Sequence, residues 1–184
     1  MDGAKDEYIP ENRRRIYGYI QDNPGVHLRK IRKELGLAMG DMQYHLSLLE
    51  KSGQIKSRRI GMHRHYYPVT VPDERHEVIF AFLGQETARD ILVYLIEHPG
   101  STQGDIADFK NFSSPTISWH MSRLVESGIV TSTKEGRTVR YFIKGDVRGI
   151  TDFLRTHQPN VWNKLASRLA DTFIELSSRE KEED

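Results

Sequence analysis

The chain has 184 residues and a mass of 21.3 kDa, which is enough for one large domain or two small ones. Hydrophobic residues make up 37% of it, charged residues 29%, and the formal net charge is +1, as in ordinary soluble globular proteins. The absence of cysteine excludes disulfides, cysteine zinc sites, iron–sulfur clusters and a cysteine nucleophile, and no apolar run approaches the roughly 20 residues of a membrane span.

The first predicted elements are three short helices followed by a pair of strands. Apolar spacing predicts helices over 13–22, 28–35 and 39–51, and strands over 54–59 and 65–69. Pro24 ends the first helix, because the residue before proline is disfavoured in helix. Gly36 can supply the positive φ that closes the second helix, and Gly61 lies at the centre of the loop between the strands.

A short spacer bounded by Pro68 and Pro72 follows, and a spacer of this kind is semi-rigid. The apolar run from Val78 to Leu83 is too rich for a loop. We expect it to start a helix that docks the second module against the first.

The same order of elements then repeats. The predicted elements are a helix from 86 or 87 to 98, a helix over 102–109, a third helix that begins at 114, and strands over 129–134 and 139–143. Ser114 as N-cap and Pro115 at the first helical position favour the start of the third helix. The strands form a hairpin around Gly136.

A constant shift of 75 residues relates the two copies, so that 12–68 lies over 87–143 without a gap. The matched pairs include Pro24-Gly25 with Pro99-Gly100, Tyr44-His45 with Trp119-His120, and Ser52-Gly53 with Ser127-Gly128. Glycines and apolar positions stay in phase together, which predicts two copies of one module of roughly 60 residues, too few for a solenoid.

The tail begins with an apolar segment and ends in a long amphipathic helix. Pro159 is expected to break the segment that carries Ile150, Phe153 and Leu154. A helix over about 160–178 then places six apolar residues on one stripe. They are Trp162, Leu165, Ala166, Leu169, Phe173 and Leu176. This helix either covers the second module or forms the seam of a homodimer, and 179–184 are expected to fray.

Three helices followed by a hairpin form a winged helix, whose second and third helices are a helix-turn-helix. The stretch TISWHMSRLVESGIVTSTKEGRTVRYF resembles the third helix and wing of ArsR/MarR-like regulators, and MQYHLSLLEKSGQIKSRRIGMHRHYY resembles a second copy. Over about 120 residues the chain is similar to tandem winged-helix transcriptional regulators common in archaea. The expected fold class is therefore mainly α with small β-hairpins: two winged domains, 1–70 and 71–145, and a C-terminal helical segment, 146–184.

In a winged helix the third helix lies in the DNA major groove, and the hairpin reaches the flanking backbone. Side chains that point outward from the third helices are therefore candidates for base contacts. They are Gln43, Tyr44 and Ser47 in the first copy, and Thr116, Ser118, Trp119, Ser122 and Arg123 in the second. The candidates for phosphate contacts are Arg29, Lys30, Arg32, Lys33, Lys56, Arg58, Arg59 and Arg64, and on the second wing Lys134, Arg137 and Arg140.

Several of these aromatic and histidine side chains have a second interpretation. Tyr44 and Trp119 either form a partner surface or lean back onto their own wing. His45 and His120 lie beside the buried face, which favours core or phosphate-facing histidines over metal ligands. The wing sequence His63-Arg64-His65 lacks a nearby cysteine or carboxylate, so we interpret it as an electrostatic wing and expect neither metal nor cofactor.

Charge is unevenly distributed between the copies. Residues 12–70 hold twelve Lys and Arg against four Asp and Glu, a balance of +8, whereas 71–145 hold eight against ten, a balance of −2. Because phosphate neutralisation supplies most non-specific DNA affinity, the first copy is the main DNA-binding candidate. The second copy either binds DNA weakly or binds a protein.

The leading functional hypothesis is a cytoplasmic, sequence-specific transcriptional regulator whose partner is double-stranded DNA. The alternative is a tandem winged-helix scaffold for protein assembly, such as a chromosome-segregation or basal-transcription accessory factor. The chain has no GxxxxGK[ST], GxSxG or HExxH motif, so we expect no enzyme. Nor does it begin like a secretory protein, and neither a membrane partner nor a particular effector is indicated.

Overall fold

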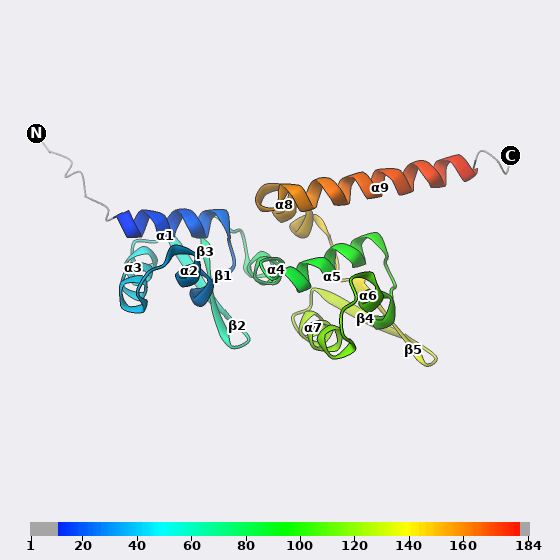
Figure 1. Cartoon of the computed structure of the whole chain (residues 1–184), viewed down its shortest axis with the longest axis horizontal. Helices are drawn as coiled ribbons and strands as arrows, with labels where there is room; N and C mark the ends of the chain where they lie inside the picture. The colour runs from blue at the N-terminus through cyan, green and yellow to red at the C-terminus, as the bar shows by residue number, and fades with distance from the viewer. Residues whose placement is uncertain (1–10, 181–184) are drawn as a thin grey trace, which may run out of the picture. The chain divides into compact units, whose positions relative to one another are not determined.

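The computed structural model describes residues 11–180, apart from the side chains at 173 and 175–180. The chain divides into two compact units, Met1–Gly84 and Gln85–Asp184, each mainly helical with a small antiparallel sheet (Figure 1). The predicted fold class is confirmed, since each unit contains a helix-turn-helix followed by a hairpin wing.

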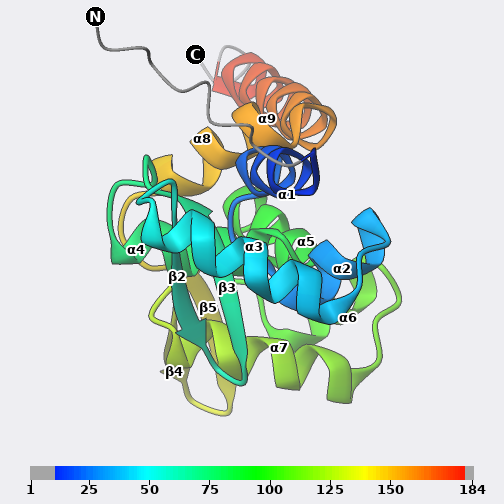
Figure 2. The same ribbon diagram turned by 90° about the vertical axis from the view of Figure 1, so that its left-hand side faces the viewer.

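The first unit contains, in chain order, α1 (Glu11–Asp22), β1 (Val26–His27), α2 (Leu28–Leu35), α3 (Met39–Lys51), β2 (Ile55–Ile60), β3 (His63–Pro68) and α4 (Glu74–Leu83). The strands form an antiparallel sheet in the order β1-β3-β2, with Ile55 opposite Pro68 and Ile60 opposite His63. Figure 2 shows α3 running across this unit and the β2–β3 hairpin projecting beyond it. These elements are the helix-turn-helix and the wing.

An apolar core fixes the three helices against one another. Ile16 and Ile20 of α1, Ile31 of α2, and Met42 and Leu46 of α3 are all buried. Burial of a side chain of this size contributes about 1.5–3 kcal/mol. This packing directs the opposite side of α3 toward solvent.

Helix α4 packs on the first unit, not at the start of the second. An added Cβ at Gly25 would lie 2.6 Å from the carbonyl carbon of Phe80, so the two backbones are in direct contact. The hydroxyl of Tyr67 in β3 donates a hydrogen bond to the carbonyl of Glu77 at 2.9 Å. The predicted domain boundary at 70/71 therefore precedes a helix that belongs to the first unit.

The second unit contains α5 (Glu86–Glu97), α6 (Gln103–Phe109), α7 (Ser114–Glu126), β4 (Val130–Glu135), β5 (Thr138–Ile143), α8 (Arg148–His157) and α9 (Pro159–Glu180). Its core includes Ile91, Ile106 and Leu124. The predicted N-cap of α7 was wrong by one residue: Ser113, not Ser114, accepts the hydrogen bond from the N–H of Thr116.

The shift of 75 residues is present in the structure. Helices α3 and α7, strands β2 and β4, and strands β3 and β5 each begin and end 75 residues apart. The pairing of Val26 with Tyr66 reappears as the bridge between Ser101 and Tyr141. The two modules thus differ in their side chains more than in their framework.

The C-terminal helix packs on its own unit along its first half. Leu165 is buried, and the guanidinium of Arg168 donates hydrogen bonds to the carboxylate of Glu97 in α5. Leu169 is 38% exposed, and the side chains of Phe173 and Leu176 lie outside the described part of the chain. Among the described residues no helix is both long and apolar enough to cross a membrane.

Candidate nucleic-acid interface

Helix α3 presents a polar and aromatic face to solvent. Gln43 and Tyr44 are exposed and Ser47 is half-buried, whereas Met42 and Leu46 of the same helix are buried. Tyr44 is 60% exposed, so it does not lean onto its own wing. Amide, phenol and hydroxyl groups on one helix face can donate to and accept from base edges.

His45 lies on the inner side of the same helix. Only 5% of it is exposed, and its Nε2 lies 3.2 Å from Oδ1 of Asp41. The other ring nitrogen, Nδ1, is buried without a hydrogen-bond partner among the described residues. The ring of Tyr44 contacts the imidazole ring of His45 edge-on, with 5.3 Å between the two ring centroids. His45 therefore belongs to the core side, as expected, but only one of its nitrogens is satisfied.

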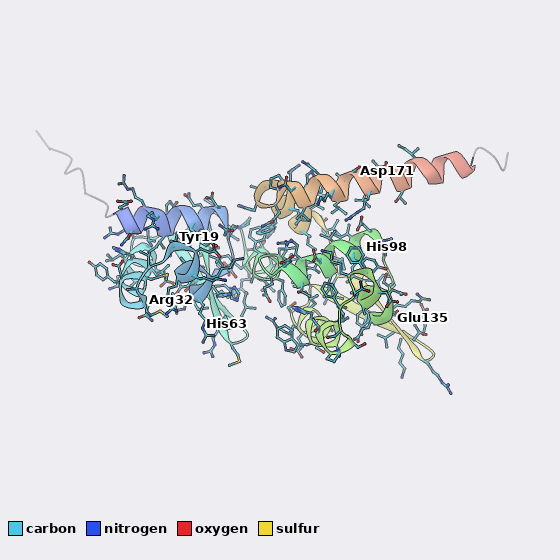
Figure 3. All side chains as sticks on the ribbon, viewed as in Figure 1. Tyr19, Arg32, His63, His98, Glu135 and Asp171 are labelled. Carbon is cyan, nitrogen blue, oxygen red and sulfur yellow. The ribbon has the colours of Figure 1, made fainter. Side chains whose placement is uncertain are left out.

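Helix α2 carries four exposed cations: Arg29, Lys30, Arg32 and Lys33. Within residues 11–180, no carboxylate forms an ion pair with Arg29, Arg32 or Lys33. Figure 3 labels Arg32 on α2 and His63 on the wing of this unit, both below α1 in this view. These three cations of α2 are thus available to an anionic partner, whereas Nζ of Lys30 donates a hydrogen bond to the carbonyl of Gly84 at 3.4 Å.

Two of the predicted wing cations form ion pairs within the first unit. Nζ of Lys56 lies 2.8 Å from the carboxylate of Glu77, Nε of Arg58 donates to the same carboxylate, and Nη2 of Arg58 lies 2.6 Å from Glu74. Burial by itself raises the pKa of Glu77, but the hydrogen bonds from Lys56 and Arg58 outweigh it and lower the pKa. Lys56 and Arg58 are therefore already paired with carboxylates of the same unit, and their contact with phosphates stays a prediction.

Arg59 and Arg64 are the remaining cations of this wing. They pair across the hairpin in register, and both are exposed. The flanking residues reduce the excess charge, because 1–11 contribute −3 and 71–84 contribute −2: Met1–Gly84 holds fourteen Lys and Arg against eleven Asp and Glu, a balance of +3. The positive charge of this unit therefore lies on α2 and the wing tip and also on α1, which carries Arg13, Arg14 and Arg15.

The face of α7 differs from that of α3. Trp119 is 56% exposed, and the guanidinium of Arg123 lies over its ring at 4.4 Å from the centroid. Arg123 also donates to the side-chain oxygen of Gln85 at 3.2 Å, and burial lowers its pKa. Ser118 and Ser122 are exposed and Thr116 is half-buried. An aromatic–arginine pair thus dominates the outer side of α7.

Like the first wing, the second wing has two cations that form no ion pair among the described residues. Lys134 and Arg137 are exposed, but Nε of Arg140 lies 2.6 Å from Glu135, and its Nη1 donates to the carbonyl of Gly100 at 3.0 Å. In the first turn of α6, Asp105 forms a capping box with Thr102 where α2 has arginine and lysine. The second unit therefore presents a weaker anion-binding surface.

The other histidines have separate surroundings in the described part of the chain. Burial lowers the pKa of His120, whose Nδ1 is buried without a described partner. On the first wing, Nδ1 of the buried His65 lies 2.6 Å from the carbonyl of Gly25. The described residues include no group of three His, Cys, Asp or Glu placed to hold a metal ion.

Two residues outside the predicted set shape the interface. Glu77 comes from a helix beyond the hairpin, and no sequence spacing connects it to Lys56. His27 is the N-cap of α2, and its ring stacks on that of His63 at 5.4 Å. A cap position directly before a helical run was visible in the sequence, although histidine is not a usual N-cap residue.

Comparisons with known proteins agree with the geometry. Residues 10–79 match a family described as an N-terminal HTH domain, and residues 85–131 match one described as a winged helix-turn-helix DNA-binding domain. An uncharacterised HTH-type transcriptional regulator of Methanocaldococcus jannaschii is 34% identical over 139 residues. That match covers 76% of this chain and 35% of the relative, so the chain spans about a third of the relative's length.

Among solved structures, the mRNA-binding domain of elongation factor SelB from E. coli, in complex with SECIS RNA, has 17% sequence identity and a TM-score of 0.33. The match covers 74% of this chain and all of that domain. At this TM-score the similarity supports no argument about ligand.

Proposed function

Because two helix-turn-helix domains follow one another in this chain, we propose that it is a cytoplasmic, sequence-specific regulator of transcription that binds double-stranded DNA. The observation that carries the proposal is the outer face of α3, where Gln43 and Ser47 share one surface with Arg29 of α2 and Arg64 of the wing. A helix fits the major groove, and cations on both sides of it can neutralise phosphates.

In this proposal α3 of the first unit lies in the major groove and contacts base edges. The cations of α2 and the wing tip hold the flanking backbone, which fixes the register of the helix without sequence preference. Bound near a promoter, the protein blocks or recruits polymerase, and no catalytic step is assigned to it.

Selection from a pool of random duplexes with the full chain tests this function. We expect the recovered duplexes to share a motif, and the affinity for it to fall steeply with salt concentration because bound cations displace counterions. The length of the motif distinguishes one reading unit from two. A pool without enrichment, or binding that is absent at physiological salt, would reject the proposal.

A second candidate function is favoured by Trp119 and Arg123 of α7. Tryptophan and arginine are the residues most enriched at the energetic centres of protein interfaces, and here they stack on an exposed face of a unit with no excess of basic charge. The second unit would then bind a protein, as in a scaffold. Trp119→Ala should in that case leave DNA affinity unchanged, whereas the matched Tyr44→Ala should reduce it.

The C-terminal helix is proposed as the seam of a homodimer. Leu169 lies one turn beyond the buried Leu165 on the same side of α9 and is 38% exposed, whereas Arg168 fastens the helix to Glu97. Sedimentation equilibrium of the full chain should give a dimer that Leu169→Glu dissociates. A wild-type chain that remains monomeric at all concentrations would contradict this.

A further inference from the structure

A groove of about 480 Å³ opens in the first unit, with walls from the start of α2, from α3 and from the wing. Leu46 and Tyr66, both buried, are among its apolar lining residues. Its volume is within the range of small-molecule sites and exceeds that of a single inorganic anion. The groove can therefore hold a polar group together with a larger organic part.

The polar groups that line the groove are mostly donors. His27, Arg29, His63 and Arg64 come from two separate elements, α2 with its cap and the wing. Glu50 is the carboxylate among the lining residues, and it accepts a hydrogen bond from the hydroxyl of Ser57. The site thus combines two permanent positive charges with two imidazoles.

The orientation of His27 suits an anion. Its Nδ1 accepts a hydrogen bond from the backbone N–H of Lys30 at 3.2 Å, so the neutral ring carries its proton on Nε2 and can donate it. The first turn of α2 contains no acidic residue, and its residues Leu28 and Arg29 line the groove. The positive end of the helix dipole adds to the attraction for a negative group.

The second unit provides an internal comparison. At a shift of 75 residues, His27, Arg29, His63 and Arg64 correspond to Thr102, Gly104, Thr138 and Val139. All four replacements are uncharged, and the first turn of α6 carries Asp105 instead. The backbones of the two modules match, so the donor groups of the groove come from side chains that only the first unit has. They are not a general feature of the fold.

We propose that this groove binds one phosphate group carried by a nucleotide, with Arg29 and Arg64 as its charged donors and His27 and His63 as its imidazole donors. Guanidinium forks match phosphate oxygens, and the apolar lining leaves room for the attached sugar. The phosphate comes either from the DNA backbone, in which case the inference rests on the proposed function, or from a free nucleotide.

The test compares two double variants of the full chain. Arg29→Gln with Arg64→Gln removes both charged donors from the groove, and Arg32→Gln with Arg59→Gln removes the same charge from exposed positions on the same two elements. Inorganic phosphate and adenosine monophosphate are titrated into each protein, and the imidazole NMR signals of His27 and His63 are followed. Ligand-dependent shifts should persist in the control pair and weaken at least roughly tenfold in the groove pair.

A duplex in which single phosphates are replaced by neutral methylphosphonates distinguishes the two sources. If the DNA backbone supplies the phosphate, a methylphosphonate at one position weakens duplex binding by the wild-type protein. The same replacement does not further weaken duplex binding by the variant that carries Arg29→Gln and Arg64→Gln. If a free nucleotide supplies it, the groove pair loses adenosine monophosphate binding while no position shows this coupling.

Two results would overturn the inference. Equal effects of the groove and control pairs in every titration would mean that only overall charge matters, and histidine signals that respond to neither anion nor duplex would mean that the groove is empty of ligand. Both can occur while the chain still binds a selected duplex, so they are separate from a failure of the proposed function.

Discussion

The guanidinium of Arg58 in β2 and the carboxylate of Glu77 in α4 form a hydrogen-bonded ion pair that joins the wing to the following helix. Glu77 is almost completely buried and also accepts from Lys56. The pair fixes the base of the wing and leaves its tip to contact a partner. It also explains why α4 belongs to the first unit.

Glu77→Gln should destabilise the first unit by about 2 kcal/mol, because it leaves two cations without their buried partner. The control is Glu74→Gln, whose carboxylate contacts the same Arg58 but is largely exposed and should contribute little. Urea unfolding of both variants measures the difference. Because the pKa of Glu77 is lowered in the folded state, its contribution should be complete above its ordinary value of 4.5 and lost as pH falls through the folded value.

Arg59→Ala should weaken binding to every duplex and reduce the slope of log affinity against log salt by about 0.9, the value for one lost phosphate contact. Arg58→Ala should change this slope less and lower the thermal midpoint instead, because Arg58 is held by Glu74 and Glu77. Fluorescence anisotropy at four salt concentrations gives both slopes. Identical slopes for the two variants would mean that Arg58 contacts a phosphate as Arg59 does.

Gln43→Ala should change the preference for one base pair by about 1–3 kcal/mol, since an amide on the exposed face of α3 can bond adenine. The equivalent position in the second unit is Ser118, and Ser118→Ala should leave the selected motif unchanged. Repeating the duplex selection with each variant measures this. A motif altered only by Ser118→Ala would assign base reading to the second unit.

Binding of duplex DNA should strengthen as pH falls below about 7. Burial lowers the pKa of His27 below its ordinary value of 6.5, and the nearby His65, His63, Lys30 and Arg29 lower it further. A phosphate in the groove would raise this pKa, so the complex would take up a proton that the free protein does not hold. His27→Gln should flatten this dependence, which anisotropy titrations between pH 5.5 and 8 in steps of roughly half a unit would show.

The same lowered pKa affects stability in the opposite direction. Without ligand, the unfolded chain binds the proton of His27 more readily than the folded chain, so the free energy of unfolding should decrease as pH falls from 6.5 through the folded pKa. A wild-type profile identical to that of His27→Gln over this window would contradict the assignment.

Gly25→Ala should be more destabilising than Gly100→Ala. Both glycines have a positive φ, +87° and +84°, which costs any other residue about 1–2 kcal/mol. At Gly25 the added Cβ would also meet the backbone of Phe80 at 2.6 Å, whereas at Gly100 it would meet the side chain of Phe142 at 3.2 Å. Urea unfolding should show the additional loss at Gly25, and equal losses would mean that α4 moves aside without cost.

The sequence by itself determined the repeat, the order of elements and the inner faces of the recognition helices. Glycine positions and apolar spacing are local signals, so Gly36 and the register of α3 with α7 follow from the printed sequence. The exposure of Tyr44 and Trp119 was one of two open alternatives, because helical periodicity gives a direction but not what neighbouring elements cover.

Only the tertiary structure decided which cations are available. Lys56 and Arg58 look the same in sequence as Arg59 and Arg64, yet the first two meet Glu77 from a helix that follows the hairpin. Their partner is chosen by the packing of α4 on Gly25 and Tyr67, a long-range contact with no spacing rule. Net charge along the chain is additive and can be counted, whereas the field at a surface depends on which opposite charges fold against it.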